Sequence, residues 1–182
     1  MKVLLISLCL DPLSELEFIE PIKHILRHHG IDTIIRHYTK FSPEDENLAD
    51  KVIICGSALK DNAFLSDGSF MWLKKINKPV LGVGSGSQAI ARTFNCNLVN
   101  RIKIGIFRIR LVRENKLIDN KKNFYAFFLT KRAIKLNEPL MALAKTGTTE
   151  CIFKHKFREV YGCLFHPEVM NPEIITNFIS RT

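Results

Sequence analysis

The sequence predicts an α/β domain of three layers, in which helices cover both faces of one open, mostly parallel sheet. Short, continuous apolar runs recur along the first half of the chain, as is typical of strands buried on both faces. Segments with helical periodicity alternate with these runs, which is the pattern of a parallel sheet. One run passes through a glycine-rich turn into a helix, and turns of this kind often present a nucleophile.

The elements of the first half follow from the order of these runs. Acidic residues follow the first run at once and no A-x-A-like cleavage site is present, so we expect a buried strand there rather than a leader. The next stripe is interrupted by Pro21, which predicts a kinked helix, and it ends at Gly30. The predicted strands are residues 2–10, 31–38, 51–56 and 79–83, and the predicted helices are residues 12–29, 70–76 and 87–94. The strands at Val3–Leu8, Val52–Ile54 and Val80–Val83 are expected to be neighbours in the centre of the sheet.

The second half of the chain has a different pattern. Between residues 102 and 165, short strand candidates are separated by polar turns, which predicts a small antiparallel insert. Residues 171–180 predict a closing helix with Pro172 near its first turn. We expect residues 1–182 to form a single domain whose sheet is of the flavodoxin or Rossmann kind.

Composition restricts the classes of function. The chain has 182 residues, 46% of them hydrophobic, and a formal net charge of +9. No apolar run is long enough to span a membrane. The basic residues are spread over the whole chain without a recognition motif, which argues against nucleic-acid binding. The five cysteines show no ligand spacing, which predicts no metal site and a reduced, cytoplasmic location. No cofactor is expected.

The segment "VYGCLFHPEV", residues 160–169, carries the most specific motif. A predicted strand ends in His166, and Pro167 separates this histidine from Glu168. Sites of open α/β sheets gather at the C-terminal ends of strands, and a histidine held by a carboxylate is the base that activates a thiol or hydroxyl. Taken alone, the motif is also compatible with a histidine that only caps the strand.

The segment "KPVLGVGSGSQAIA", residues 78–91, forms the glycine-rich turn. Its centre is Gly84, which offers no side chain for chemistry. Ser85 and Ser87 are the neighbouring hydroxyls. Ser85 has bulky Val83 as a flank, and Ser87 would lie a turn into the helix, so neither fits the turn's centre well.

Together these segments resemble the class I glutamine amidotransferases, over nearly the full length of the chain. Residues 78–91 resemble that family's elbow, "PVLGICxGHQxIA", and "REVYGCLFHPEV" resembles its "xxYGVQFHPEV". "KVIICGSA" resembles the strand that ends in "SGGP", whose backbone helps to form the oxyanion hole. Within the family, the free-standing amidotransferase subunits of GMP synthase are nearest in compactness. The resemblance implies a glutaminase that supplies ammonia to a synthase partner.

The same comparison shows departures from the family pattern. Gly84 stands where the family has its cysteine nucleophile, and Gly82 and Gly86 keep the small flanks that fix this register. Thr130, Lys131 and Arg132 replace the family's "SHxD" segment, and Ser57 and Ala58 replace part of the oxyanion strand. Carried over by position, the retained catalytic partners are His166 and Glu168. The residues carried over for substrate binding are Gly56, Ser57, Ser85 and Gln88.

These departures favour one functional hypothesis and leave a second open. The first is a degenerate amidotransferase-like domain, inactive as a glutaminase, that binds a protein such as a synthase or a glutamine-like small molecule. The alternative is an active glutaminase subunit with an unconventional nucleophile, or one whose cysteine was replaced. Whether the chain is an enzyme is therefore left undecided by the sequence.

The segment "RIKIGIFRIRLVR", residues 101–113, alternates basic and apolar residues. Arg101 and Lys103 are expected on one strand face, and Arg108 and Arg110 on one face after a break near Gly105. The segment is interpreted as an exposed strand with solvated cations, or as a docking surface for an acidic or nucleotide-bearing partner.

Overall fold

The computed structural model describes residues 1–66, 68–119 and 122–182. Among these residues, nine strands form one sheet in the order β2-β1-β3-β4-β9-β8-β6-β5-β7. Its parallel part contains β1 (Lys2–Ser7), β2 (Asp32–His37), β3 (Lys51–Ile54), β4 (Val80–Val83) and β9 (Val160–Cys163). The predicted neighbours β1, β3 and β4 do lie side by side, because their apolar runs are buried on both faces.

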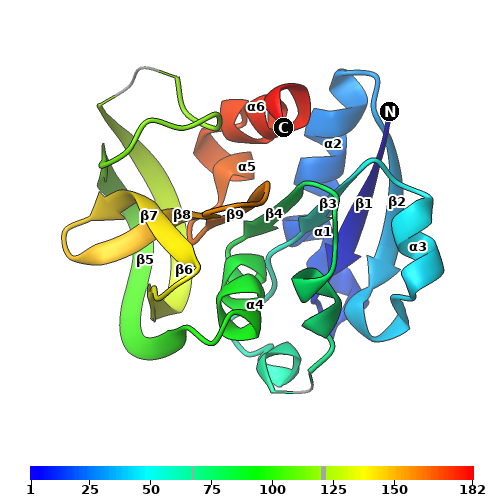
Figure 1. The fold of residues 1–182 in the computed structure, drawn as a ribbon, viewed down its shortest axis with the longest axis horizontal. Helices are drawn as coiled ribbons and strands as arrows, with labels where there is room; N and C mark the ends of the chain where they lie inside the picture. The colour runs from blue at the N-terminus through cyan, green and yellow to red at the C-terminus, as the bar shows by residue number, and fades with distance from the viewer. Residues whose placement is uncertain (67, 120–121) are drawn as a thin grey trace.

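The other four strands form a closed antiparallel barrel. They are β5 (Asn97–Leu111), β6 (Asn123–Lys135), β7 (Leu140–Thr146) and β8 (Thr149–His155). β5 pairs with β6, β6 with β8, β8 with β7 and β7 with β5, so the ring is complete. The barrel stands beside the parallel strands, at the left of Figure 1.

The barrel overturns the predicted fold class. Of the nine strand pairings described, four are parallel and five antiparallel, so the sheet is not the mostly parallel, three-layer, flavodoxin- or Rossmann-like sheet that we expected. The antiparallel part is not small either, since β5 has 15 residues and β6 has 13. Polar residues near the ends of these strands, such as Asn100 and Arg101 in β5 and Lys131 and Arg132 in β6, make each strand look shorter in the sequence than it is. The only irregularity in the β5–β6 register that the described residues show lies between Asn100 and Lys103, not at Gly105.

Helices pack around the parallel strands. They are α1 (Glu15–Phe18), α2 (Glu20–His28), α3 (Pro43–Asn47), α4 (Ser85–Thr93), α5 (Pro167–Met170) and α6 (Glu173–Arg181). Short 3₁₀ helices occupy Pro12–Ser14, Tyr38–Lys40, Ala63–Leu65 and Met71–Lys74. In Figure 1, α2, α5 and α6 lie on one side of these strands and α4 on the other. No helix in the described ranges has the length and apolar character needed to cross a membrane.

Pro21 divides the first predicted helix in two. α1 ends at Phe18 and α2 begins at Glu20, with the proline in the first turn of α2. A proline has no amide hydrogen to donate, so the first turn is where a helix tolerates it. The break directs Phe18 toward the C-terminal ends of the strands, where it contacts a histidine of the site described below.

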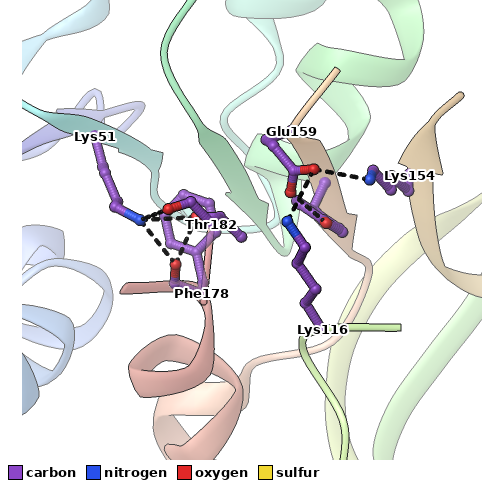
Figure 2. Close-up of polar contacts among 7 residues, drawn as sticks. Lys51, Lys116, Lys154, Glu159, Phe178 and Thr182 are labelled. Carbon is purple, nitrogen blue, oxygen red and sulfur yellow. Dashed lines mark hydrogen bonds and ion pairs between the residues drawn. The ribbon is translucent and has the colours of Figure 1, made fainter. Parts of the chain in front are cut away.

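An ionic cluster at the start of β9 joins the barrel to the parallel strands. Glu159 accepts hydrogen bonds from Tyr161 Oη (2.6 Å) and Lys154 Nζ (3.0 Å), and Lys116 Nζ lies 3.2 Å from the same carboxylate. Burial alone would raise the pKa of Glu159, but these three donors outweigh it and hold the pKa below its ordinary value. Figure 2 shows this cluster beside Lys51, which donates to backbone oxygens at the end of α6.

Candidate active site

The glycine-rich turn forms a sharp strand-to-helix elbow. β4 ends at Val83, α4 begins at Ser85, and Gly84 between them has φ 53° and ψ −118°. The Gly84 amide donates to Cys163 O on the adjacent strand at 2.8 Å, which fixes the elbow against β9. Side chains rarely adopt this positive φ, and glycine adopts it without strain.

The small residues on either side of the elbow have a physical role. A Cβ on Gly86 would lie 2.1 Å from Ile54 O, and one on Gly82 would lie 2.7 Å from the backbone of Gly86. The helix therefore approaches β3 and β4 too closely for any side chain at these positions. This packing agrees with the predicted register, in which Gly84 is the central residue of the elbow.

His166 and Glu168 form a buried pair at the C-terminal end of β9. His166 Nδ1 lies 2.8 Å from Glu168 Oε1, and the two side chains are 4% and 1% exposed. The His166 amide donates to Phe127 O on β6, and the ring of Phe18 lies 5.7 Å from the imidazole, centroid to centroid. The predicted hydrogen bond between the two side chains is confirmed, whereas their catalytic role stays a prediction.

The imidazole of His166 faces two glycines. A Cβ on Gly84 would lie 2.7 Å from His166 Cε1 and 2.8 Å from Nε2, and one on Gly56 would lie 2.8 Å from Cε1. Nε2, the ring nitrogen that is not bound to Glu168, therefore lies beside residue 84. The arrangement is that of an oriented imidazole whose neighbouring position bears no side chain.

Neither serine of the elbow is directed at this base. Ser87 is fully buried and its hydroxyl donates to Gly84 O at 2.6 Å. The hydroxyl of Ser85 lies 2.9 Å from that of Ser57, on the segment after β3. Each hydroxyl is thus bound to a group other than the imidazole.

Three of the predicted residues, Ser57, Ser85 and Gln88, line a very small cavity. Its volume is about 20 Å³, and its other walls come from residues 58, 59, 61 and 62 and from residues 129–132. Gln88 Nε2 donates to Thr130 Oγ1 at 2.9 Å across it. Such a volume holds about one water molecule, so a glutamine side chain does not fit without movement of the wall.

Sequence reasoning missed several residues of this region. Asp61 is 3% exposed, accepts from the Leu10 amide at 3.3 Å, and has no hydrogen-bond partner for Oδ1 within the described ranges. Thr130 was noted only as a departure, yet it binds Gln88. An acidic residue shortly after a buried strand could have indicated Asp61. No feature of the sequence indicates the contact of Phe18 with His166.

The cysteines near the site are poor nucleophiles. Cys9 Sγ lies 3.8 Å from Gly56 O, and burial raises the pKa of its thiol to about 11. Burial also raises the pKa values of Cys55 and Cys163, with a further contribution from the charge of Glu168 in both. A thiol acts as a nucleophile through its thiolate, so at neutral pH these groups are inert.

Comparison with known proteins identifies the family. The family description "Glutamine amidotransferase class-I" matches residues 14–181. The chain therefore belongs to the class I glutamine amidotransferases. One subunit of the glutamine-hydrolysing GMP synthase from Methanosarcina barkeri is 28% identical over 176 residues, which cover 90% of each chain. The corresponding subunit from Pyrococcus furiosus is 26% identical and is matched over 89% of this chain and 92% of its own length.

Other similar proteins extend this picture. A γ-glutamyl-CDP-amidate hydrolase from Campylobacter jejuni is 35% identical over 94 residues, 51% of this chain and 44% of the relative. A Thermoplasma acidophilum structure, provisionally described as a subunit of GMP synthase, matches 98% of this chain and 92% of its own, with a TM-score of 0.86 and 22% identity. A glutamine amidotransferase from Thermotoga maritima matches with a TM-score of 0.68 and 17% identity, over 92% and 76% of the two chains. At these identities the structures demonstrate a shared fold.

Proposed function

We propose that this chain retains the amidotransferase fold but does not hydrolyse glutamine, and that it acts by binding a synthase-type protein. The observation that carries the proposal is Gly84 at the centre of the elbow, directly before the Nε2 atom of His166. Hydrolysis by the family's route needs a thiolate that forms a γ-glutamyl thioester, and Gly84 supplies no attacking atom. Loss of a nucleophile in comparable hydrolases lowers turnover by up to about 10⁶-fold.

The cavity supports the same conclusion. Its volume of about 20 Å³ and the Gln88–Thr130 hydrogen bond leave no room for the substrate as the wall now stands. A glutamine-like ligand would have to displace residues 129–132 of β6. We therefore expect the predicted substrate-binding residues that line it, Ser57, Ser85 and Gln88, to have little substrate to contact.

The outer face of β5 and β6 is the proposed surface for the partner. Exposed apolar side chains gather there, and we call them the β5–β6 patch: Ile102 (71% exposed), Ile104 (55%), Ile106 (60%) and Tyr125 (59%). Ile104 pairs with Leu129, which lines the small cavity, so the patch borders the candidate site. Arg108 continues the exposed face, which fits a partner with an apolar centre and an acidic rim.

Two of the basic residues predicted to lie exposed on this strand, Arg101 and Lys103, do not belong to the patch. Arg101 is bound to Thr148 and Thr149, and the Lys103 amine lies 4.3 Å from the centroid of the Phe107 ring. Burial lowers the pKa of Lys103, with a further contribution from Arg101. These two cations are therefore held by the barrel, and Arg108 is the one we assign to docking.

The alternative function is an active glutaminase subunit. The buried His166–Glu168 pair favours it, since an oriented base is retained. Ammonia release from glutamine decides between the two, measured with the chain alone and with the ATP-binding subunit of a GMP synthase from the same organism. We expect no release. Activity that Ser85→Ala or Ser87→Ala abolishes would show that a serine has become the nucleophile, and our proposal would fail.

Binding of that ATP-binding subunit tests the second half of the proposal. We expect Ile104→Asp to weaken the complex at least about tenfold, because it places a charge in the centre of the patch. Leu48→Asp is the matched control, since Leu48 is 53% exposed and directly follows α3, a helix that lies on the far side of Figure 1 from the barrel. Equal binding by both variants, or no complex with the unmodified chain, would exclude the patch as this partner's docking surface.

A further inference from the structure

A large basic cavity lies outside the candidate active site. Its volume is about 790 Å³, within the range of small-molecule sites, and it is formed by the end of β5, the segment that follows it, the start of β6 and the end of α6. It shares no lining residue with the small cavity beside Gln88. A ligand here would therefore not be the glutamine of the family's reaction.

The charges that line this cavity are unbalanced. Four basic side chains, Arg110, Arg113, Lys122 and Arg181, face two acidic ones, Glu114 and Asp119. Arg181 is already engaged with Asp119 through both of its terminal nitrogens. Within the described ranges, no ion pair joins Arg110, Arg113 or Lys122 to a carboxylate, although Glu114 lines the same opening, so the cations there outnumber the carboxylates.

The register of the barrel increases this excess of charge. Arg110 on β5 stands directly opposite Lys145 on β7. Like charges in that relation are destabilising, and of the two cations only Lys145 has a counterion among the described residues, Glu150 at 3.3 Å. An anion bound at Arg110 would offset the repulsion, and guanidinium groups match phosphate oxygens in geometry.

The other walls suggest a ligand larger than a simple ion. Leu111, Val112 and Ile118 contribute apolar surface to the same cavity, and the volume far exceeds that of one phosphate group. We propose that this cavity binds a phosphate-bearing small molecule, whose phosphates contact Arg110, Arg113 and Lys122 and whose remaining part lies against the apolar wall. The inference is independent of the proposed function, because none of these residues belongs to the candidate active site or to the β5–β6 patch.

Calorimetric titration of the full chain at constant ionic strength tests this site. The probes are inorganic phosphate, pyrophosphate and ATP, with sodium chloride as the blank. We expect saturable binding of one molecule per chain, tighter for pyrophosphate and ATP than for phosphate. Arg110→Ala and Arg113→Ala should each weaken binding about tenfold, the value of one hydrogen bond between charged groups.

The control must separate a built site from general attraction to a basic protein. Arg27→Ala removes one exposed cation from α2 and gives the same net charge as each test variant. It should leave the affinity for pyrophosphate within about twofold of the unmodified chain. The proposal fails if no probe binds saturably, if Arg27→Ala weakens binding as much as Arg110→Ala, or if a single-stranded oligonucleotide binds the same residues more tightly than ATP. Thermal unfolding of each variant identifies any loss that is due to misfolding.

Discussion

The imidazole of His166 fills the space that a side chain on Gly84 would need. A Cβ there would lie 2.7 Å from Cε1 and 2.8 Å from Nε2, closer than real Cβ contacts. Glu168 holds the imidazole at Nδ1, and the Phe127 carbonyl holds the backbone amide of His166. The packing around residue 84 thus fits a glycine. A side chain with a nucleophile could be placed there only if the His166 imidazole moved.

The first prediction follows from that contact. Gly84→Ala and Gly84→Cys should each lower the free energy of unfolding by about 1–3 kcal/mol, because positive φ strain and the contact with His166 act together. Denaturant unfolding measures this. Gly30→Ala is the control, since Gly30 also has a positive φ (69°) but nothing lies within 4 Å of its Cβ position. Equal losses at the two sites would contradict a role for His166.

A second prediction concerns turnover in the same variant. Gly84→Cys should give a thiol but little ammonia release, since Thr130 and its neighbours close the cavity and His166 must first move aside. Modification by a thiol reagent and a glutaminase assay measure the two properties separately. Full turnover from this single change would mean that the rest of the site is intact, and the glycine would then be a recent or engineered replacement.

The buried pair itself gives a third prediction. Glu168→Ala should destabilise the chain by about 1–3 kcal/mol, because it leaves the buried Nδ1–H of His166 without an acceptor. Glu168→Gln keeps a carbonyl oxygen at that place and should lose clearly less. Urea unfolding of the two variants compares them, and a larger loss for the glutamine variant would refute the hydrogen-bond explanation.

The fourth prediction is a dependence of stability on pH. Burial lowers the pKa of His155, and the charges of Arg158 and Lys154 lower it further. The unfolded chain therefore takes up a proton near pH 6.5 that the folded chain takes up only at lower pH, so stability is greatest above about pH 6.5 and falls as pH decreases below it. His155 Nδ1 accepts from the Phe157 amide at 3.1 Å, so protonation there also breaks a hydrogen bond.

Variants at histidine positions test this dependence. His155→Gln should flatten the fall in unfolding free energy between about pH 6.5 and 5, a window above the usual titration of carboxylates. His24→Gln, which removes an exposed imidazole on α2, should keep the unmodified profile. An unchanged slope in His155→Gln would assign the pH dependence to other groups.

The fifth prediction concerns the ionic cluster of Figure 2. Glu159→Gln should lower the unfolding free energy at pH 7 by about 1–3 kcal/mol, because Tyr161, Lys154 and Lys116 lose a charged acceptor. The folded pKa of Glu159 is lowered, so its contribution is present above the unfolded value near 4.5 and is lost as pH falls through the folded value. The difference between variant and unmodified chain should therefore shrink at acid pH, and a difference that persists at pH 2 would contradict this account.

The two halves of the chain were unequally predictable. Continuous apolar runs predict β1, β3 and β4, because a strand that is buried on both faces is apolar at successive positions. β5 has no such run, because basic residues alternate with Ile102, Ile104 and Ile106, which face outward; this alternation predicts a strand over residues 101–113 but not its full extent from Asn97. Closure of the barrel depends on pairs far apart in sequence, such as Arg110 with Lys145, which no local pattern indicates.

The candidate site divides in the same way. The spacing of His166 and Glu168 predicts their hydrogen bond because Pro167 fixes the backbone between them. The positions of Gln88, Thr130 and Asp61 depend on how β6 packs against α4 and the segment after β3, which is a tertiary property. How closely the imidazole of His166 approaches Gly84 is also set by this packing.

Closure of the barrel also limits how copies of this chain could associate through their backbones. β7 is last in the strand order, yet it pairs with β8 and, through Ala144 and Lys145, with the end of β5. β2 is the first strand in that order, it pairs with β1, and it bears Asp32, Arg36 and His37. Charged, short border strands are the usual protection against strand addition and fibre growth. The β2 border of the sheet is thereby protected by charge against templated aggregation.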